Sequence, residues 1–177
     1  CDVVVVGAGL VGAAVAARLA QEDVDVAVLE AQTVAGGATG RSMGMVLTGL
    51  PGHYTWAIST YGREKAREVW SLTVEGRQRL IETGGRLGVS VRKTGSLALA
   101  VEDAEAEAMQ ESAVLLQEDG FEARFTPRDV LDRGFPAALR YPDDAVVDAA
   151  ALTRSLLAGS GAALHPRTEV YDLQPEG

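Results

Sequence analysis

Three glycines near the start of the chain lie within the sequence GAGLVG and have the spacing G-x-G-x-x-G. In this pattern the first glycine permits a tight turn, the second lets a pyrophosphate approach the backbone, and the third lets a helix pack close to a sheet. The N-terminus of that helix offers free N–H groups and a partial positive charge to phosphates. The sequence therefore predicts a dinucleotide site whose backbone contacts come from Gly7, Ala8, Gly9, Leu10, Val11 and Gly12.

An acidic residue, Glu30, stands about 20 residues beyond the glycines, as the ribose contact of such a site requires. It ends a second apolar run, Val24–Leu29. A carboxylate at this position would accept hydrogen bonds from both hydroxyls of an adenosine ribose and would sit badly beside a 2′-phosphate, so NADP is disfavoured. We expect Glu30 and the adjacent Ala31 to contribute to the cofactor site.

The segment from Ala31 to His53 contains six glycines and no amphipathic period. A nicotinamide-binding domain would normally enter another short loop and helix here, whereas a long loop inside a compact domain is usually functional. Thr39, Arg41 and Ser42 offer two hydroxyls and a guanidinium suited to the pyrophosphate and ribityl chain of a flavin dinucleotide. The alternative is a solvated glycine-rich loop without a ligand.

The elements that would position these residues can be predicted from the pattern of apolar residues. The β-branched run Val3–Val6 predicts a strand buried on both faces of a parallel sheet, followed by a helix over Leu10–Ala20 and a second strand over Val24–Leu29. The strand, glycines, helix, second strand and acid thus occur in the order that a dinucleotide-binding unit needs.

Further elements are expected beyond the loop. Helices are predicted at Tyr61–Thr83 with Trp70 in the core, at Glu102–Glu118 with a buried stripe of Ala106, Met109, Ala113 and Leu116, at a short segment from Thr126-Pro127 with Asp129 to Gly134, and at Ala149–Ala158 after the cap Asp148. Gly84-Gly85 and Gly159 are expected to end the first and last of these helices, and a strand is expected at Ser96–Val101.

Composition excludes several classes of protein. The chain has 177 residues, 47% of them hydrophobic, and a formal net charge of −9 without a basic cluster, so we expect no nucleic-acid partner and no attraction to anionic membranes. A single cysteine, Cys1, permits no internal disulfide, and no metal-ligand spacing occurs. No apolar run is long enough to cross a bilayer, and we expect a cytoplasmic protein.

Three stretches together resemble a known family. The sequences VVVVGAGLVGAAVAARLA, VAVLE and GGATGRSMGM are similar to the N-terminal half of the FAD-dependent oxidoreductases that include D-amino-acid oxidase, glycine oxidase and sarcosine oxidase. The later stretch VVDAAALTRSLLAGSGAALHPRTEV is similar to the helix and strand that return the family's chain to its FAD domain. The resemblance implies further cofactor contacts, from the loop at Ala38, Gly44 and Met45, and from Val170 at the adenine end.

The resemblance also implies an architecture. It is an α/β fold with an FAD-binding, Rossmann-like domain of the glutathione-reductase type and part of an inserted α+β substrate domain. The FAD domain would comprise residues 1–88 and 142–177, and the substrate domain residues 89–141. Because the family's chain continues well past the residue that matches Gly177, we expect the sequence to be an incomplete portion of the enzyme, lacking most of the substrate-carboxylate contacts.

The function implied by the resemblance is FAD-dependent oxidation of an amine or amino acid to an imine, with oxygen or another acceptor taking the electrons. The cofactor does the chemistry, so no acid–base residue is required. His53 and Tyr54 follow the loop and could reach a substrate, although an exposed loop histidine is the commoner case. The alternatives are another FAD- or NAD-dependent oxidoreductase on the same fold and a non-catalytic dinucleotide-binding subunit; the sequence leaves the oligomeric state open.

Overall fold

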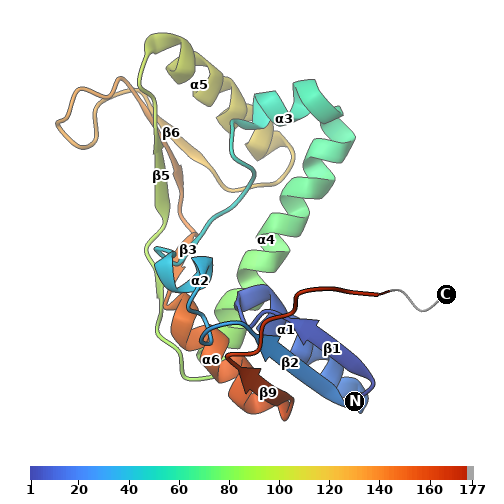
Figure 1. Cartoon of the computed structure of the whole chain (residues 1–177). Coiled ribbons are helices and arrows are strands. Elements are labelled where there is room, and N and C mark those ends of the chain that lie inside the picture. Colours follow the sequence, from blue (N-terminus) through green and yellow to red (C-terminus); the bar gives the residue numbers. More distant parts are fainter. Residues whose placement is uncertain (175–177) are drawn as a thin grey trace. The chain divides into compact units, whose positions relative to one another are not determined.

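A three-stranded parallel sheet lies at the centre of the part of the chain that carries the glycine motif. In the computed structural model, which describes residues 1–174, its strand order is β1-β2-β9 (Figure 1). The strands are β1 (Val3–Val6), β2 (Val26–Glu30) and β9 (Ala163–Pro166). The predicted first strand is confirmed, and the second begins two residues later than expected and includes Glu30.

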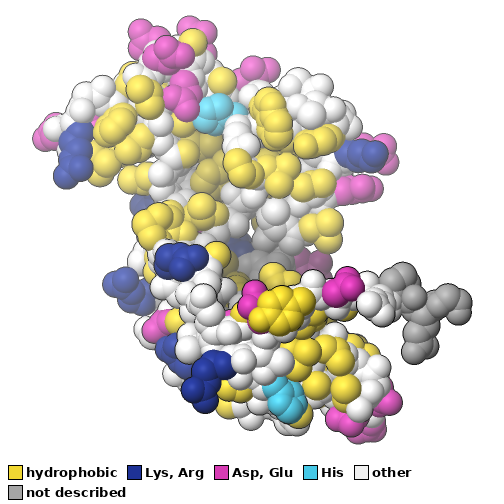
Figure 2. Space-filling model, in the orientation of Figure 1, with side chains coloured by type: hydrophobic (Ala, Val, Ile, Leu, Met, Phe, Trp, Pro, Cys, Tyr) yellow, Lys and Arg dark blue, Asp and Glu magenta, His cyan; other side chains and the backbone are white. Residues whose placement is uncertain are grey.

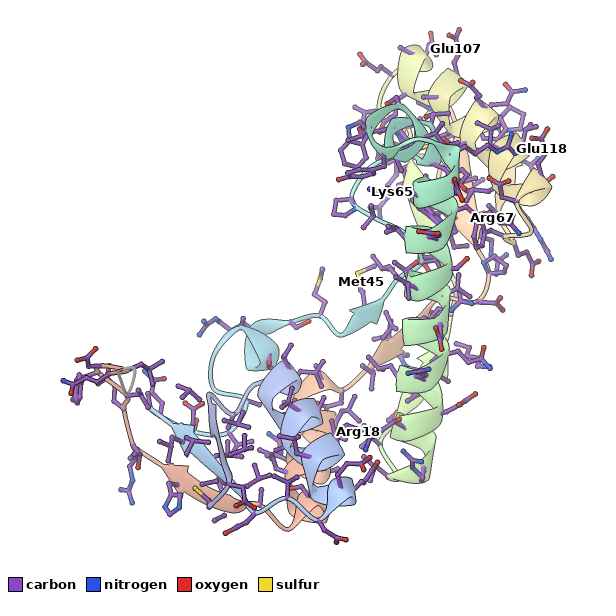
Figure 3. The ribbon with its side chains drawn as sticks, turned by 90° about the vertical axis from the view of Figure 1, so that its right-hand side faces the viewer. Arg18, Met45, Lys65, Arg67, Glu107 and Glu118 are labelled. Atoms are coloured by element: carbon purple, nitrogen blue, oxygen red, sulfur yellow. The ribbon has the colours of Figure 1, made fainter. Side chains whose placement is uncertain are left out.

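Two helices pack against each other on one face of this sheet (Figures 1 and 3). They are α1 (Leu10–Leu19), which continues into a 3-10 turn at Ala20–Glu22, and α6 (Ala149–Ser160). Ala13 and Ala16 of α1 are fully buried, because the small side chains let the helix approach the strands closely. Asp148 accepts a hydrogen bond from the N–H of Ala151 at 2.8 Å and so caps α6 as predicted.

The opposite face of the sheet is open in the described residues. Val4 and Val6, which point to this face, are 49% and 56% exposed. Figure 2 shows hydrophobic side chains gathered in this region. The expectation that β1 is buried on both faces is therefore wrong for residues 1–174, because α1 and α6 cover one face only.

The chain divides into two compact units. Unit 1 comprises residues 1–44, 84–90 and 147–177, and unit 2 comprises residues 45–83 and 91–146. The domain boundaries that the family resemblance implies remain a prediction.

Unit 2 contains two small sheets and an aromatic core. One sheet has the order β5-β7-β6 and the other β3-β8-β4. The strands are β3 (Met45–Val46), β4 (Val91–Lys93), β5 (Ser96–Leu99), β6 (Arg124–Thr126), β7 (Ala138–Tyr141) and β8 (Ala145–Val147). The helices are α3 (Tyr54–Tyr61), most of α4 (Arg63–Arg86) and α5 (Asp103–Glu118). The predicted core position of Trp70 is confirmed, since it is 1% exposed and packs edge-on against Tyr54 at 4.8 Å between ring centroids.

Two predicted helix ends and one predicted short helix are wrong. Helix α4 runs through Gly84-Gly85 and ends at Arg86, and α6 passes Gly159 and ends at Ser160 before the left-handed Gly161. A glycine inside a helix costs only about 1 kcal/mol, so packing elsewhere along these helices outweighs it. The segment after Thr126 is irregular, because Asp129 accepts hydrogen bonds from the N–H groups of a loop rather than from those of a helix.

The helix predicted at Glu102–Glu118 is present as α5. Its residues Met109, Ala113 and Leu116 are buried as expected, and Ala106 is partly buried against the same core. No helix within residues 1–174 combines the length and the apolar composition that crossing a membrane requires.

Candidate dinucleotide-binding site

The turn between β1 and α1 leaves no room for a side chain at the third glycine of the motif. Gly7 adopts a left-handed backbone conformation, with a φ angle of +97°, and its N–H donates to the carbonyl of Leu29 at 2.7 Å. A Cβ on Gly12 would lie 2.0 Å from the carbonyl oxygen of Gly7. The turn is therefore closed by direct backbone contact between the first and third glycines, as the motif predicts.

The N-terminus of α1 presents donors that the protein does not use. Gly9 is the N-cap, with extended backbone and no side chain to accept from the first turn. Within residues 1–174, the N–H groups of Val11 and Gly12 have no hydrogen-bond partner. Two unpaired N–H groups at the positive end of a helix dipole form a site for an anion such as a pyrophosphate.

Glu30 connects the end of β2 to the glycine turn. Its Oε2 accepts a hydrogen bond from the N–H of Ala8 at 2.8 Å, and its Oε1 accepts from the N–H of Gln32 at 2.8 Å. These two bonds fix the orientation of the carboxylate, and each oxygen keeps a further lone pair for a ligand hydroxyl. The structure therefore places Glu30 beside the predicted phosphate site.

The predicted flavin loop contains short regular elements. Helix α2 (Ala38–Arg41) and strand β3 occupy a small part of it, and the remainder of residues 31–53 forms turns and loop. Thr39 reaches the glycine turn, where its Oγ1 accepts from the N–H of Leu10 at 3.1 Å and lies 3.3 Å from the position of a Cβ on Gly9. Arg41 is exposed, and within residues 1–174 the one hydrogen bond of its guanidinium goes to the carbonyl of Gly36 in the same loop, at 3.4 Å.

Gly44 lies against the start of the segment that leads into α6. Its φ angle is +70°, its carbonyl accepts from the N–H of Val147 at 2.9 Å, and a Cβ would lie 1.8 Å from the carbonyl oxygen of Val147. Its own N–H donates to Oγ of Ser42 at 3.1 Å. Met45, labelled in Figure 3, is the first residue of unit 2; it lies on β3 opposite Val146 and is 49% exposed.

The remaining predicted cofactor residues lie around the same part of unit 1. Ala31 and Ala38 are exposed, at the end of β2 and the start of α2. Val170 is half-buried in the segment after β9, where the N–H of Thr168 donates to the carbonyl of Glu30 at 2.8 Å. This hydrogen bond brings the segment that contains Val170 to the end of β2.

His53 and Tyr54 have different environments from those expected. His53 is only 24% exposed, and its Nε2 lies 3.3 Å from Oε1 of Glu105. Tyr54 is fully buried, and its hydroxyl donates to Oδ2 of Asp119 at 2.8 Å. Desolvation by burial and the hydrogen bond to Asp119 raise the pKa of Tyr54 well above its usual value. The expectation that Tyr54 could reach a substrate is therefore wrong, and a solvent-exposed His53 is not observed.

Sequence reasoning missed a buried carboxylate in unit 2. Asp144 is 1% exposed and accepts hydrogen bonds from the N–H and the hydroxyl of Thr48, at 3.0 and 2.7 Å, and from the hydroxyl of Ser96 at 2.6 Å. Nη1 of Arg77 lies 3.3 Å from Oδ1 of Asp144. These bonds join Asp144, which precedes β8, to Thr48 after β3, to Arg77 in α4 and to Ser96 in β5. No local pattern could reveal the cluster, because its members lie up to 96 residues apart.

Comparison with known proteins gives one family. A family model described as FAD dependent oxidoreductase matches residues 2–177. A curated relative, the gamma-glutamylputrescine oxidoreductase of Escherichia coli, is 32% identical over 112 residues, which is 63% of this chain and 26% of the relative.

Solved structures of the same fold match over nearly the whole chain. Glycine oxidase from Geobacillus kaustophilus has a TM-score of 0.73 and 25% identity, with 98% of this chain and 48% of that chain covered. An L-alpha-glycerophosphate oxidase from Mycoplasma pneumoniae with FAD bound has a TM-score of 0.69 and 19% identity, with 96% and 45% covered. The expected FAD-binding α/β fold is confirmed. The chain spans about half the length of these structures and about a quarter of the curated relative.

Proposed function

The chain belongs to the family of FAD dependent oxidoreductases, and from that premise we propose that it takes part in oxidising the C–N bond of an amine or amino acid to an imine. FAD is the cofactor of the family. The observation that carries the cofactor part of the proposal is the pair of N–H groups at Val11 and Gly12, which have no hydrogen-bond partner within residues 1–174 and lie beside a turn where Gly12 has no room for a Cβ.

The residues present fit one half of a flavin dinucleotide site. The first turn of α1 would hold the pyrophosphate, since Gly9 has no side chain to obstruct it. Glu30 would accept the ribose hydroxyls through its remaining lone pairs. Thr39, held at the glycine turn by Leu10, would keep the segment from Ala38 to Gly44 along the ribityl chain. Val170 would contact the adenine through its backbone.

The chemistry that bound FAD supplies is acceptance of a hydride from the carbon that bears the amine, after which water hydrolyses the imine. The residues of this chain bind and orient: the helix N-terminus neutralises phosphate charge, and the glycines allow close approach of the backbone. Two similar proteins support an amine or amino acid as the substrate class: the curated relative is a gamma-glutamylputrescine oxidoreductase, and a structural neighbour is a glycine oxidase. Reoxidation by oxygen or another acceptor and a cytoplasmic location complete the proposal.

Anaerobic mixing of the full-length protein with candidate substrates tests the proposal. We expect a yellow preparation whose oxidised-flavin absorbance is bleached by a primary or secondary amine or an amino acid, with a carbonyl product after hydrolysis. A matched hydroxy compound, glycerol 3-phosphate, serves as the control and should leave the absorbance unchanged. A colourless folded protein would contradict the cofactor assignment, and bleaching by glycerol 3-phosphate alone would contradict the C–N chemistry.

A further inference from the structure

The outer face of the sheet β5-β7-β6 in unit 2 carries an arginine at its centre. The inner face packs against the core through Ala98, Leu139 and Phe125. Side chains alternate between the faces of a strand, so Leu97 and Arg140, which are paired across β5 and β7, point to the outer face. Arg140 lies on the middle strand and is exposed.

A second arginine faces the first. Arg124 on β6 lies directly opposite Arg140 in the antiparallel register, and like charges in that relation are destabilising. Nη2 of Arg124 is neutralised by Oε1 of Glu122 at 2.5 Å. Within residues 1–174 the side chain of Arg140 makes no hydrogen bond and no ion pair. The middle of this sheet face thus holds one positive charge that the described protein does not compensate.

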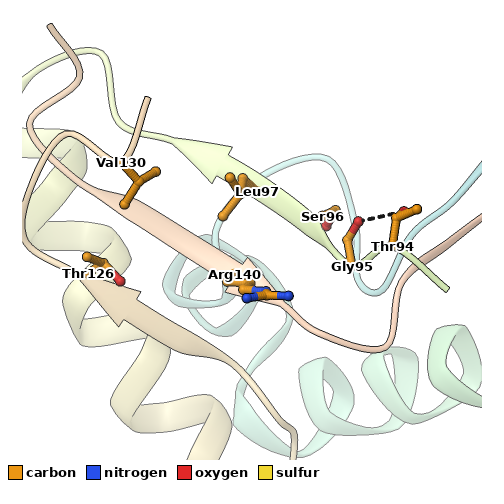
Figure 4. Close-up of a pocket in the computed structure, with 7 residues that line it drawn as sticks. All are labelled: Thr94, Gly95, Ser96, Leu97, Thr126, Val130 and Arg140. Carbon is orange, nitrogen blue, oxygen red and sulfur yellow. Dashed lines mark hydrogen bonds between the residues drawn. The ribbon is translucent and has the colours of Figure 1, made fainter. Parts of the chain in front are cut away.

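Arg140 lines a pocket of about 460 Å³, a size suited to a small molecule (Figure 4). Thr126 offers a hydroxyl, and Leu97 and Val130 offer apolar surface around the guanidinium. The carboxylate of Asp129, one residue before Val130 in the loop, is occupied by hydrogen bonds from backbone N–H groups, including that of Leu131 at 3.0 Å. It therefore does not supply the missing partner.

We propose that this pocket binds the carboxylate of a small aliphatic acid. A guanidinium presents two parallel donors that match the two oxygens of a carboxylate. One uncompensated positive charge balances one carboxylate, whereas a phosphate group carries about −1.5 to −2 charges near neutral pH and would exceed it. Leu97 and Val130 would contact the aliphatic part of the acid. All these residues belong to unit 2, so the proposal does not depend on the cofactor residues of unit 1.

Calorimetric titration of the full-length, FAD-loaded protein tests this site, with butyrate as the probe and butyramide and inorganic phosphate as comparators. We expect butyrate to bind and butyramide, which lacks the charge, to bind at least about tenfold more weakly. Arg140→Gln should weaken butyrate binding about tenfold or more, the scale of a charge-assisted hydrogen-bond pair. Arg140→Lys should weaken it less, because the charge remains while the paired donors are lost.

The control variant is Arg79→Gln, which removes one positive charge from an exposed ion pair with Glu75 on α4, away from the pocket. It should leave the butyrate affinity within about twofold. Equal butyrate affinity in the wild type and in both Arg140 variants would overturn the proposal. So would tighter binding of phosphate than of butyrate, or no binding of butyrate to the wild type. Flavin absorbance is measured in parallel, so failure of this site is distinct from failure of the proposed oxidase function.

Discussion

The glycine turn of unit 1 and the Asp144 cluster of unit 2 hold their surroundings in opposite ways. The turn depends on absent atoms, since a Cβ on Gly12 would overlap a carbonyl oxygen, and the same is true of Gly44 elsewhere in unit 1. The cluster depends on atoms that are present, since Asp144 accepts from several donors brought by separate segments. Gly12 and Gly44 should therefore fail when side-chain atoms are added, and the Asp144 cluster should fail when they are removed.

The largest effect is expected when the carboxylate of unit 2 is removed. Asp144→Ala leaves the guanidinium of Arg77, which is 12% exposed, without its buried carboxylate partner, and it removes the acceptor to which the hydroxyls of Thr48 and Ser96 donate. We expect the free energy of unfolding to fall by about 3 to 5 kcal/mol, measured by denaturant titration of the full-length protein. Asp143→Ala is the matched control, because Asp143 is 57% exposed beside the same arginine, and it should cost less than about 1 kcal/mol. Equal losses would remove the contrast between buried and exposed partners.

The complementary test adds one carbon to unit 1. Gly44→Ala introduces a Cβ 1.8 Å from the carbonyl oxygen of Val147 at a φ angle of +70°. Overpacking and the left-handed backbone together should cost about 2 to 4 kcal/mol in denaturant titration. Gly159→Ala, in a helix with open space around it, should instead stabilise the protein by up to about 1 kcal/mol. If the two alanines had similar effects, lack of space would not be what distinguishes Gly44.

A smaller effect, measured as a loss of FAD affinity, is expected at Glu30. Glu30→Ala should weaken FAD affinity by about 1 to 3 kcal/mol, the scale of lost charge-assisted hydrogen bonds, as measured by flavin release on dilution. Glu30→Gln separates the charge from the geometry, because the amide keeps one acceptor. Unchanged affinity in both variants would show that the carboxylate does not contact the ribose and that unit 1 binds through its backbone only.

The smallest effect is a change in acid sensitivity within unit 2. Hydrogen bonds from Arg63, the largest cause, and from Tyr54 hold the pKa of Asp119 below its usual range, while burial opposes them. Since the folded pKa lies below the unfolded pKa, this stabilisation is complete above the unfolded pKa and is lost as pH falls through the folded value. In denaturant titrations at decreasing pH, the free energy of unfolding of Arg63→Gln should therefore fall less steeply than that of the wild type. The series starts at pH 5, about one unit above the ordinary pKa of an aspartate. Arg79→Gln should keep the wild-type slope, and identical slopes in all three proteins would contradict the assignment.

The glycine turn could be predicted because its chemistry is local. Gly7 and Gly12 meet within one turn, and Glu30 follows at the end of the next strand, so sequence spacing determines their geometry. The polar partners of unit 2 could not be predicted in this way. Asp144 meets Thr48 across 96 positions and Ser96 across 48, and neither separation has a periodic signature.

The wrong predictions at helix ends and at Tyr54 have a common cause, which is that a local sequence signal competes with interactions made elsewhere. Gly84-Gly85 and Gly159 look like helix ends, yet α4 and α6 continue through them because the penalty per glycine is small. Asp129 after Pro127 looks like a helix start, but the same carboxylate can satisfy the N–H groups of a loop equally well. Tyr54 follows a flexible loop in the sequence and nevertheless enters the core, where Trp70 and Phe121 pack around it.

The contact between Gly44 and Val147 has a consequence for recombination between members of the family. The chain leaves unit 1 after Gly44 and re-enters it at Val147, so these two residues mark a seam at which a chimera changes parent. A donor segment grafted between them must fit this junction. Position 44 accepts no residue larger than glycine, and position 147 needs a backbone N–H, which excludes proline there. Residues 84–90 return to unit 1 within that segment. A viable exchange must therefore take this inner stretch from the parent that supplies the glycine turn, or adapt it to that parent.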